Sequence, residues 1–372
     1  MKPRSLTISV MLLLTFSLTS FAGTYTIPKT YTSGDTLTAS DLNNENTAIK
    51  TAVDDNNTAS RFYGDGSAGA LTISSSVSWT SAPPAGNNLN FTNVVIDAGQ
   101  TLNVTAGTTI RCSGTFTNNG TISVGTGSGR NSSSWQSSGA IGPTVGFRTI
   151  PMPGDSFRSA SLGGFTNSGS TGVVTQLFSG SGGYGIPQTT AASSFSQFRI
   201  GGGSGAGWSG GAGGGLIKIQ CAGGIVNAGT INANGLSGSG ATGGGGGGIV
   251  ILASATSIDN TAGTINANGG NGGNAISYGG NGGGGGGGII IMVAPSLSTT
   301  GQTNSVAAGT GGTGTTNVTT ENRSGGGGGG ASGGNGGNGG SVSAAASGVP
   351  ANAAGGSIGY VLEIQTNPAN MM

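Results

Sequence analysis

The residues that could do chemistry in this chain are few and scattered. Its 372 residues include no histidine and only 11 Asp and Glu together. Without histidine the chain lacks the usual general base, the histidine-dependent nucleophilic triads and the commonest zinc ligand. Two carboxylates suffice for a glycosidase, and Asp97 with Asp155 is the least implausible pair, although no pattern brings them together. We therefore predict a protein without catalytic residues, cofactor or metal site, and keep a carboxylate-only glycan hydrolase as a distant alternative.

Two short motifs invite a chemical interpretation that their context does not support. The stretch GAGWSG at 205–210 matches the dinucleotide fingerprint, but a β-type run follows it where a helix is needed. Cys112 and Cys221 would be free to form a disulfide in an exported protein. Each is equally consistent with a small buried apolar residue, and their matching positions in a repeat, described below, favour burial.

Aromatic and basic residues gather in one segment and suggest binding. Residues 126–200 hold 8 of the 20 aromatic residues and 4 of the 8 arginines. Aromatic rings with polar neighbours suit sugar rings, because the faces stack while the hydroxyls bond at the edge. The candidate ligand-binding residues are Trp135, Tyr184, Trp208, Arg148, Arg158 and Tyr278. The alternative is that most of the phenylalanines form a small core that holds a long loop.

Charge excludes several classes of partner. Only 6% of the residues are charged, and the net charge is +1. Nucleic-acid binding needs clustered Lys and Arg to displace counterions, and anionic membrane surfaces need the same. No segment beyond the N-terminus reaches the roughly 18 apolar residues of a membrane helix. We therefore expect no nucleic-acid partner and no membrane insertion.

The N-terminus has the pattern of an export signal. Lys2 and Arg4 precede an apolar run from 6 to 18, and Ser20-Phe21-Ala22 offers small residues for cleavage. We predict a signal peptide over 1–22 and a mature chain from Gly23. The protein is then extracellular, on the cell surface or periplasmic.

Residues 23–60 contain one expected helix. Ser40 or Asp41 would cap it, and Leu42, Ile49 and Val53 would form an apolar stripe over roughly three turns. Such a short helix is marginal alone and would need partners, of which identical copies are the simplest. A frayed surface helix is the alternative.

Residues 61–125 predict short β-strands, and a repeat links them to the rest of the chain. The segment 110–124 (IRCSGTFTNNGTISV) aligns without gaps to 219–233 (IQCAGGIVNAGTINA), which matches Cys112 to Cys221 and Asn118 to Asn227. The motif returns at 257–269 and, more weakly, at 303–309. Such spacing indicates stacked units, none stable alone, with insertions on one face.

Residues 201–372 alternate apolar strands with glycine. Residues 201–340 hold 53 of the 82 glycines, many in a three-residue rhythm such as GGNGGNGG at 333–340. A polyproline-II-type helix has three residues per turn, so two of its edges would be bare backbone able to bond sideways to neighbours. The strands at 249 and 289 are apolar on both faces, and we expect the glycine tracts to cover them. A flexible tether is the alternative.

With these residues in view, the chain resembles bacteriophage tail-fibre and tail-tip adhesins. GDTLTASDLNNENTAI at 34–49 is similar to N-terminal fibre segments, and FYGDGSAGALTI at 62–73 with residues 98–127 resembles a recurring shaft module. The glycine tracts resemble polyglycine-II tips whose loops touch the host receptor. Phage fibres carry no signal peptide, so residues 1–22 make the chain more similar to the adhesive trimers of predatory bacteria of the Bdellovibrio type. The resemblance implies a homotrimer and an adhesin.

The sequence as a whole predicts a mainly β, elongated, solenoid-like protein. Its expected parts are a signal peptide (1–22), a segment with a trimerising helix (23–60), a β-shaft (61–125), an aromatic and Arg-containing insertion (126–200) and a glycine-rich repeat head of polyglycine-II helices and strands (201–372). The expected function is non-catalytic binding to a surface glycan or envelope component. The main alternative is a purely structural surface or matrix fibre without a specific ligand.

Overall fold

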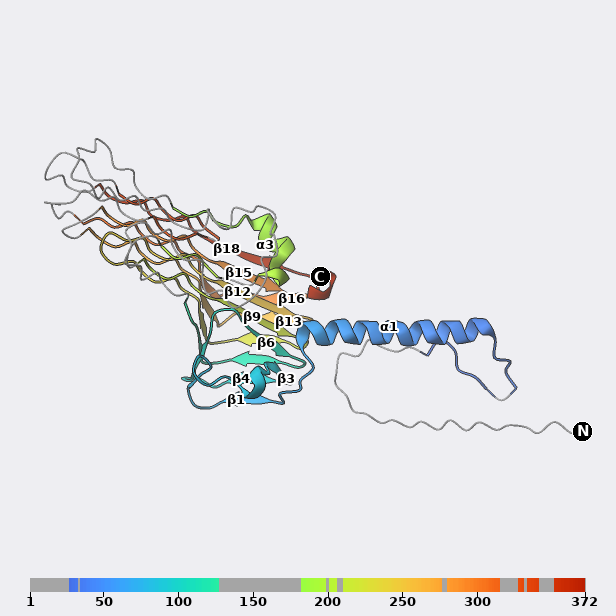
Figure 1. Ribbon diagram of the computed structural model, residues 1–372. Helices are drawn as coiled ribbons and strands as arrows, with labels where there is room; N and C mark the ends of the chain where they lie inside the picture. The colour runs from blue at the N-terminus through green and yellow to red at the C-terminus, as the bar shows by residue number, and fades with distance from the viewer. Residues whose placement is uncertain are drawn as a thin grey trace, which may run out of the picture. The chain divides into compact units, whose positions relative to one another are not determined.

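The protein is mainly β, with few helices (Figure 1). The computed structural model describes residues 27–32, 34–126, 182–198, 201–205, 210–275, 280–314, 327–330, 333–340 and 351–371. Contacts divide the chain into two compact units, 1–56 and 57–372. None of the described helices is both long enough and apolar enough to cross a membrane.

The main element of the first unit is helix α1 (Ala39–Tyr63), whose last turns belong to the second unit. Thr38 caps it: the Asp41 amide donates to Thr38 Oγ1 at 3.2 Å, and the Thr38 amide donates to Asp41 Oδ2 at 3.0 Å. This reciprocal pair is a capping box with an aspartate in the third position. The expected cap at Ser40 or Asp41 was wrong. The Thr38 hydroxyl, and not the side chain of either residue, accepts from the Asp41 amide at the start of the helix. Hydrogen bonds from Thr38 also lower the pKa of Asp41.

Helix α1 is longer than the apolar stripe predicts. The stripe of Leu42, Ile49 and Val53 covers roughly three turns, whereas the helix has 25 residues. These three side chains are 50%, 49% and 60% exposed. The expected helix is therefore confirmed, but its apolar face is not covered within the described chain.

The second unit is built on three parallel sheets of six strands each. The first sheet contains β1 (Leu71–Ile73), β4 (Val94–Ile96), β7 (Phe116–Asn118), β10 (Ile225–Asn227), β13 (Ser257–Asp259) and β16 (Ser296–Ser298). The second contains β2 (Val77–Ser78), β5 (Thr101–Val104), β8 (Thr121–Val124), β11 (Thr230–Asn232), β14 (Thr264–Asn266) and β17 (Thr303–Ser305). The third contains β3 (Asn90–Phe91), β6 (Thr108–Cys112), β9 (Leu216–Cys221), β12 (Ile249–Ser254), β15 (Ile289–Val293) and β18 (Tyr360–Ile364).

The strand order shows that the chain coils. Neighbours in every sheet differ by three in chain order, so each successive set of three strands adds one strand to each sheet. Six such turns stack on one another through parallel pairing. The same three sheets run through 61–125 and 201–372, so the strands of the expected shaft and of the glycine-rich region belong to one coil.

The gapless sequence repeat is the pairing register itself. Ile110 pairs with Ile219 and Cys112 with Cys221 between β6 and β9. Asn118 pairs with Asn227 between β7 and β10, at the same offset. A sequence repeat here is one turn of the coil lying directly on the previous turn.

The interior of the described coil is mainly apolar, and it also contains a file of amides. Ile, Val, Leu and Cys side chains from all three sheets form a buried core. At one corner Asn118 Nδ2 donates to Asn227 Oδ1, and Asn227 Nδ2 donates to Asn260 Oδ1, both at 2.7 Å. All three residues are buried, and the stacked amides satisfy one another as buried polar groups must.

Cys112 and Cys221 belong to this core as free, buried thiols. The interpretation of both as small buried residues is confirmed. Burial raises the pKa of the Cys221 thiol, which keeps it neutral.

A second core covers the outer face of the third sheet. Alternate residues of β12 and β15, such as Ile251 and Ile291, point away from the interior. Side chains of α3 (Gln188–Ser194), η2 (Phe195–Gln197) and the end of α1 lie over them, with Phe195 fully buried. The expectation that glycine tracts cover these strands was wrong: a short aromatic-bearing helix does. Phe195 and Phe198 lie in this core, as the alternative of a small phenylalanine core expected, whereas the other phenylalanines of 126–200 lie outside the described residues. Two further short helical turns are η1 (Ala85–Asn87) and η3 (Pro368–Met371).

Candidate functional site

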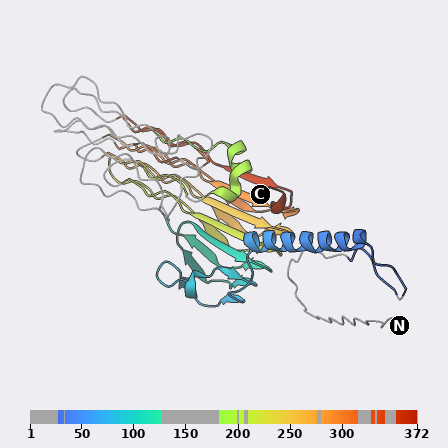
Figure 2. The same cartoon turned by 45° about the vertical axis from the view of Figure 1, so that its right-hand side comes forward.

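The glycine-rich segments all leave the coil at one corner. The four long connections, 125–215, 233–248, 267–288 and 306–359, each join a strand of the second sheet to the next strand of the third. Figures 1 and 2 show their described parts running side by side away from the strands. The prediction that insertions lie on one face is thus met by these connections.

The glycine segments are joined by backbone hydrogen bonds in three directions. Three successive amides donate to three different neighbours: Gly244 to Gly283, Gly245 to Leu236 and Gly246 to Gly203, at 2.8–2.9 Å. The pattern recurs three residues on, where Gly247 donates to Gly286 and Gly248 to Ala233. The segment 243–248 therefore has a partner on every side. A two-sided strand could not achieve this.

Asparagines follow the same three-residue step. The Oδ1 atoms of Asn268, Asn271 and Asn274 accept from the amides of Ala307, Thr310 and Thr313, at 2.8–2.9 Å. Each asparagine therefore bridges one connection to the next. This explains the repeating G-G-N triplet: two positions supply bare backbone and the third supplies a lateral bond.

Space, and not backbone angle, requires glycine here. A Cβ at Gly244 would overlap the carbonyl oxygen of Gly270, and one at Gly285 would overlap that of Gly245. Neither glycine has a positive φ. Neighbouring glycine segments of the chain lie too close together for any side chain to fit between them.

Of the six candidate ligand-binding residues, only Tyr184 lies in the described part of the chain. It is 67% exposed, between Gly183, which donates to Gly328, and Gly185, which donates to Asn335 Oδ1. Trp135, Trp208, Arg148, Arg158 and Tyr278 lie outside the described residues.

The described residues next to two of these candidates lie together. Trp208 falls between Gly205 and Gly211 in the sequence, and Tyr278 falls between Gly273 and Gly282. Gly211 donates to Gly243, and Gly273 donates to the adjacent Thr242, both at 2.9 Å. Gly211 and Gly273 therefore bond to adjacent residues of one glycine segment, whereas nothing is described of Trp208 and Tyr278 themselves.

The carboxylate pair of the hydrolase alternative stays a prediction, because the structure describes only one of its two residues. Asp155 lies outside the described residues, and Asp97 follows β4 at a turn. Within the described ranges no group of three Cys, Asp or Glu residues could hold a metal ion.

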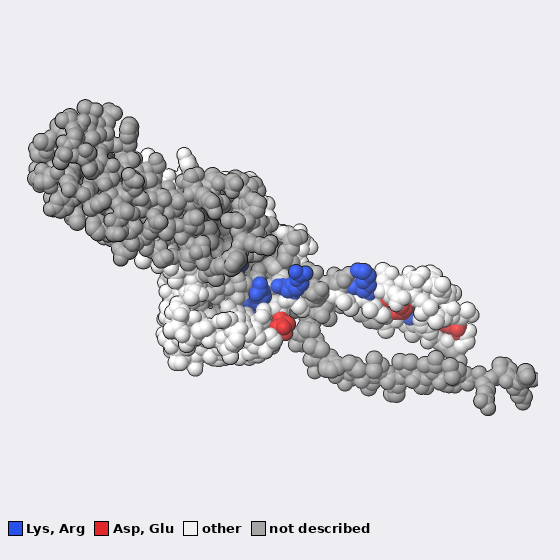
Figure 3. Space-filling model, in the orientation of Figure 1, with Lys and Arg blue, Asp and Glu red and all other residues white. Residues whose placement is uncertain are grey.

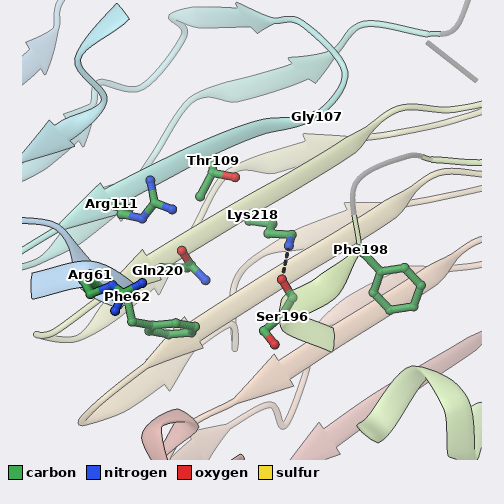
Figure 4. Close-up of a pocket in the computed structure, with 9 residues that line it drawn as sticks. All are labelled: Arg61, Phe62, Gly107, Thr109, Arg111, Ser196, Phe198, Lys218 and Gln220. Atoms are coloured by element: carbon green, nitrogen blue, oxygen red, sulfur yellow. Dashed lines mark hydrogen bonds between the residues drawn. The ribbon is translucent and has the colours of Figure 1, made fainter. Parts of the chain in front are cut away.

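A cavity of about 260 Å³ opens on the outer face of the third sheet (Figure 4). We call it the basic cavity. It is lined by Arg61, Phe62, Gly107, Thr109, Arg111, Ser196, Phe198, Lys218 and Gln220. Three elements bring its cations together: Arg61 from the end of α1, Arg111 from β6 and Lys218 from β9.

Strand register explains the polar floor of the basic cavity. Thr109 pairs with Lys218 and Arg111 with Gln220, which places two polar pairs on the outer face of β6 and β9. The next strand has Ile251 and Ala253 at these positions, under the aromatic cover. The cavity therefore lies where the sheet's outer face changes from apolar to polar.

Lys218 is held in place although it is nearly buried. Its side chain is 4% exposed, and Nζ donates to the Ser196 carbonyl oxygen at 2.7 Å. Gln220 is also 4% exposed. The two side chains from β9 are therefore nearly buried at the floor, whereas Arg61 is exposed at the rim.

The sequence contained a signal for this cavity that the prediction did not use. In LIKIQC the alternation correctly placed Lys218 and Gln220 opposite Ile217 and Ile219. The gapless repeat also matches Arg111 to Gln220. Together these put a cation and polar groups on one outer face, but Arg61 joins them only through the fold.

Comparison with protein-family models, curated proteins and solved structures found no match in any of the three.

Proposed function

We propose that the protein is an exported, non-catalytic adhesin of the tail-fibre type that binds a surface glycan or another envelope component. The observation that carries the proposal is the common corner of the four long connections. A coil that sends every insertion out at one corner can present several segments together, and such insertions are frequently the binding part of a repeat protein.

The glycine segments would form a bundle of polyglycine-II helices. Such a helix has three residues per turn and no internal hydrogen bonds, so its amides point in three directions in turn. The three partners of Gly244, Gly245 and Gly246 fit this geometry. The bundle would give the binding segments a stiff support, which lowers the entropy lost on binding.

Helix α1 would associate three copies of the chain. Leu42, Ile49 and Val53 recur at spacings of seven and four, as apolar positions of a coiled coil do. Their exposure in the described chain fits a face that another copy covers. Trivalent display would strengthen weak contacts with a repetitive surface through avidity.

A glycan array with the mature chain tests adhesion. We expect saturable binding to at least one surface glycan and a loss of at least about tenfold in the Trp208→Ala, Tyr278→Ala double variant, because truncating aromatic anchors commonly removes 1.4 kcal/mol or more. Tyr31→Ala is the matched control, since Tyr31 is an exposed aromatic in the first unit.

Absence of binding to every glycan and to intact envelopes would contradict adhesion and favour the purely structural fibre. Release of reducing sugar from a bound polysaccharide would instead favour the hydrolase.

A further inference from the structure

Three segments of the long connections are bonded side by side and carry exposed residues. They are 182–186, 333–338 and 351–358. The Gly185 amide donates to Asn335 Oδ1 at 2.6 Å, and the Ser357 amide donates to the Asn335 carbonyl oxygen at 2.7 Å. The middle segment, 333–338, is therefore bonded to both of the others.

Exposure in the middle segment follows the three-residue step of its asparagines. Asn335 and Asn338 are exposed, and Gly337 between them is buried. Tyr184, in the segment bonded on one side, is 67% exposed, and Ile358, in the segment bonded on the other, is 75% exposed. We call these four exposed residues, Tyr184, Asn335, Asn338 and Ile358, the Tyr184 face.

The backbone that carries Tyr184 is held by hydrogen bonds on both sides of the residue. The Gly183 carbonyl oxygen accepts from the Gly336 amide at 2.7 Å. The Ile186 carbonyl oxygen accepts from the Tyr360 hydroxyl at 2.8 Å. A tyrosine also has few rotatable bonds, so this exposed ring loses little conformational entropy when a ligand covers it.

The two asparagines add hydrogen-bond donors to the Tyr184 face. Their Oδ1 atoms accept from the Gly185 and Gly182 amides, at 2.6 Å and 2.8 Å. Among the described residues neither Nδ2 group donates a hydrogen bond, so each exposed amide keeps two N–H donors for a ligand. At the rise of about 3.1 Å per residue of a polyproline-II-type helix, the two asparagines would be about 9 Å apart.

Charge around the Tyr184 face points to a neutral ligand. Charged residues make up 6% of the chain, and Figure 3 shows how few appear on the side drawn. The segments 182–186, 333–338 and 351–358 contain no Lys, Arg, Asp or Glu. A charged ligand would therefore gain no opposite charge from these segments.

A neutral glycan combines the features that this surface can recognise. The C–H-rich side of a sugar ring can stack on Tyr184, while its hydroxyl or N-acetyl oxygens accept from the asparagine Nδ2 groups. Ile358 adds an apolar contact on the far side of the asparagine row. The asparagine spacing is similar to the interval between every second ring of an extended β-linked chain.

We infer that the Tyr184 face binds a neutral, unbranched, β-linked glycan, with one sugar ring on Tyr184 and the following rings along Asn335 and Asn338. This inference rests on the proposed adhesion and names a ligand class for it. Its residues differ from Trp208 and Tyr278, so the two assignments can fail separately.

Calorimetric titration of the protein with glucose and cellotetraose, and with N-acetylglucosamine and its β-linked tetramer, tests the inference. At least one tetramer is expected to bind at least tenfold more tightly than its monomer, because only the longer chain reaches Tyr184 and both asparagines. Its affinity should not change with salt, since no charges meet.

Two variants assign that binding to the Tyr184 face. Tyr184→Ala should lower the affinity for the tetramer at least tenfold, because the stacking surface is lost, whereas Tyr184→Phe keeps the ring and should retain most of the affinity. Tyr184 is exposed, so both variants should unfold at the same denaturant concentration as the unaltered protein. Tyr31→Ala, in the first unit, is the control and should leave affinity unchanged.

Equal affinity for monomer and tetramer would overturn the inference, as would unchanged affinity in Tyr184→Ala. Array binding that is lost in the Trp208→Ala, Tyr278→Ala variant but intact in Tyr184→Ala would overturn the inference and leave adhesion standing. Absence of glycan binding in both the array and the titration would contradict adhesion and the inference together.

Discussion

At the scale of single residues, this protein uses glycine for close approach. Most of the described glycines in the connections have an ordinary φ, yet a Cβ on them would overlap backbone atoms of a neighbouring segment of the chain. Turn glycines such as Gly99, with φ +77° and open space around it, serve the opposite purpose. The two classes therefore respond differently to substitution.

Gly285→Ala should destabilise the protein by at least about 1–3 kcal/mol, because overpacking forces the backbones apart. The matched control is Gly355→Ala in the same set of segments, where the nearest atom to an added Cβ is Gly309 O at 3.3 Å and φ is not positive. That variant should change stability by less than about 1 kcal/mol. Denaturant unfolding measures both, and equal effects would contradict close backbone packing at Gly285.

The asparagine file makes a prediction about pH. In Asn227→Asp the new carboxyl can still accept from Asn118, but it can donate to Asn260 only when protonated. Burial raises the pKa of such a carboxyl above its unfolded value. The variant should therefore be most stable at low pH and lose up to about 1.4 kcal/mol per pH unit as pH rises from about 4 towards the folded pKa.

Unfolding at several pH values measures this loss, with Asn103→Asp on the outward, half-buried side of β5 as control. The control should show no such fall. A flat pH profile for Asn227→Asp would contradict the buried amide file.

At the scale of elements, the sequence predicted those parts of the fold that repeat. Each turn carries the same pattern, so the alignment of Cys112 with Cys221 gave the strand register directly. The alternation in LIKIQC gave the inner and outer faces of β9 correctly. Both succeed because stacking places equivalent residues on one another.

Elements that occur once could not be predicted in the same way. The cover formed by α3 and Phe195 comes from a segment without the repeat, and its partners are set only by the fold. Arg61 and Lys218 are far apart in sequence, so no local sequence pattern indicates that they line the same cavity. Hence the prediction from sequence found the repeat that forms the coil. It wrongly expected glycine tracts to cover the outer face of β12 and β15, and it did not find the basic cavity.

The exposed stripe of α1 makes a prediction at this scale. Replacing Leu42, Ile49 and Val53 together by Ser should shift the chain from the proposed threefold mass towards that of one copy, because the apolar face that we propose joins the copies is lost. Light scattering measures the mass, and unchanged thermal unfolding of residues 57–372 checks that the second unit remains folded. Asn44→Ser, an exposed polar position of α1, is the control.

A threefold mass that survives the triple substitution would contradict association through α1. A single-copy mass for the unaltered chain would contradict the trimer itself.

At the scale of the whole molecule, two kinds of order depend on each other. The coil buries apolar side chains inside three sheets, and its corner holds the glycine connections in register. The described glycine segments of these connections have few side chains to bury, so backbone bonds must offset the large conformational entropy cost of ordering glycine. The central claim of this account is that those bonds form and persist.

Amide hydrogen exchange read out residue by residue tests that claim most directly. The amides of 243–248 and 282–288 should exchange at least about 100-fold more slowly than in an unstructured peptide, as amides in stable hydrogen-bonded structure do. Strand amides of β12 and β15 provide the internal standard. Exchange of both glycine segments at the rate of a free peptide, beside protected strands, would contradict the account.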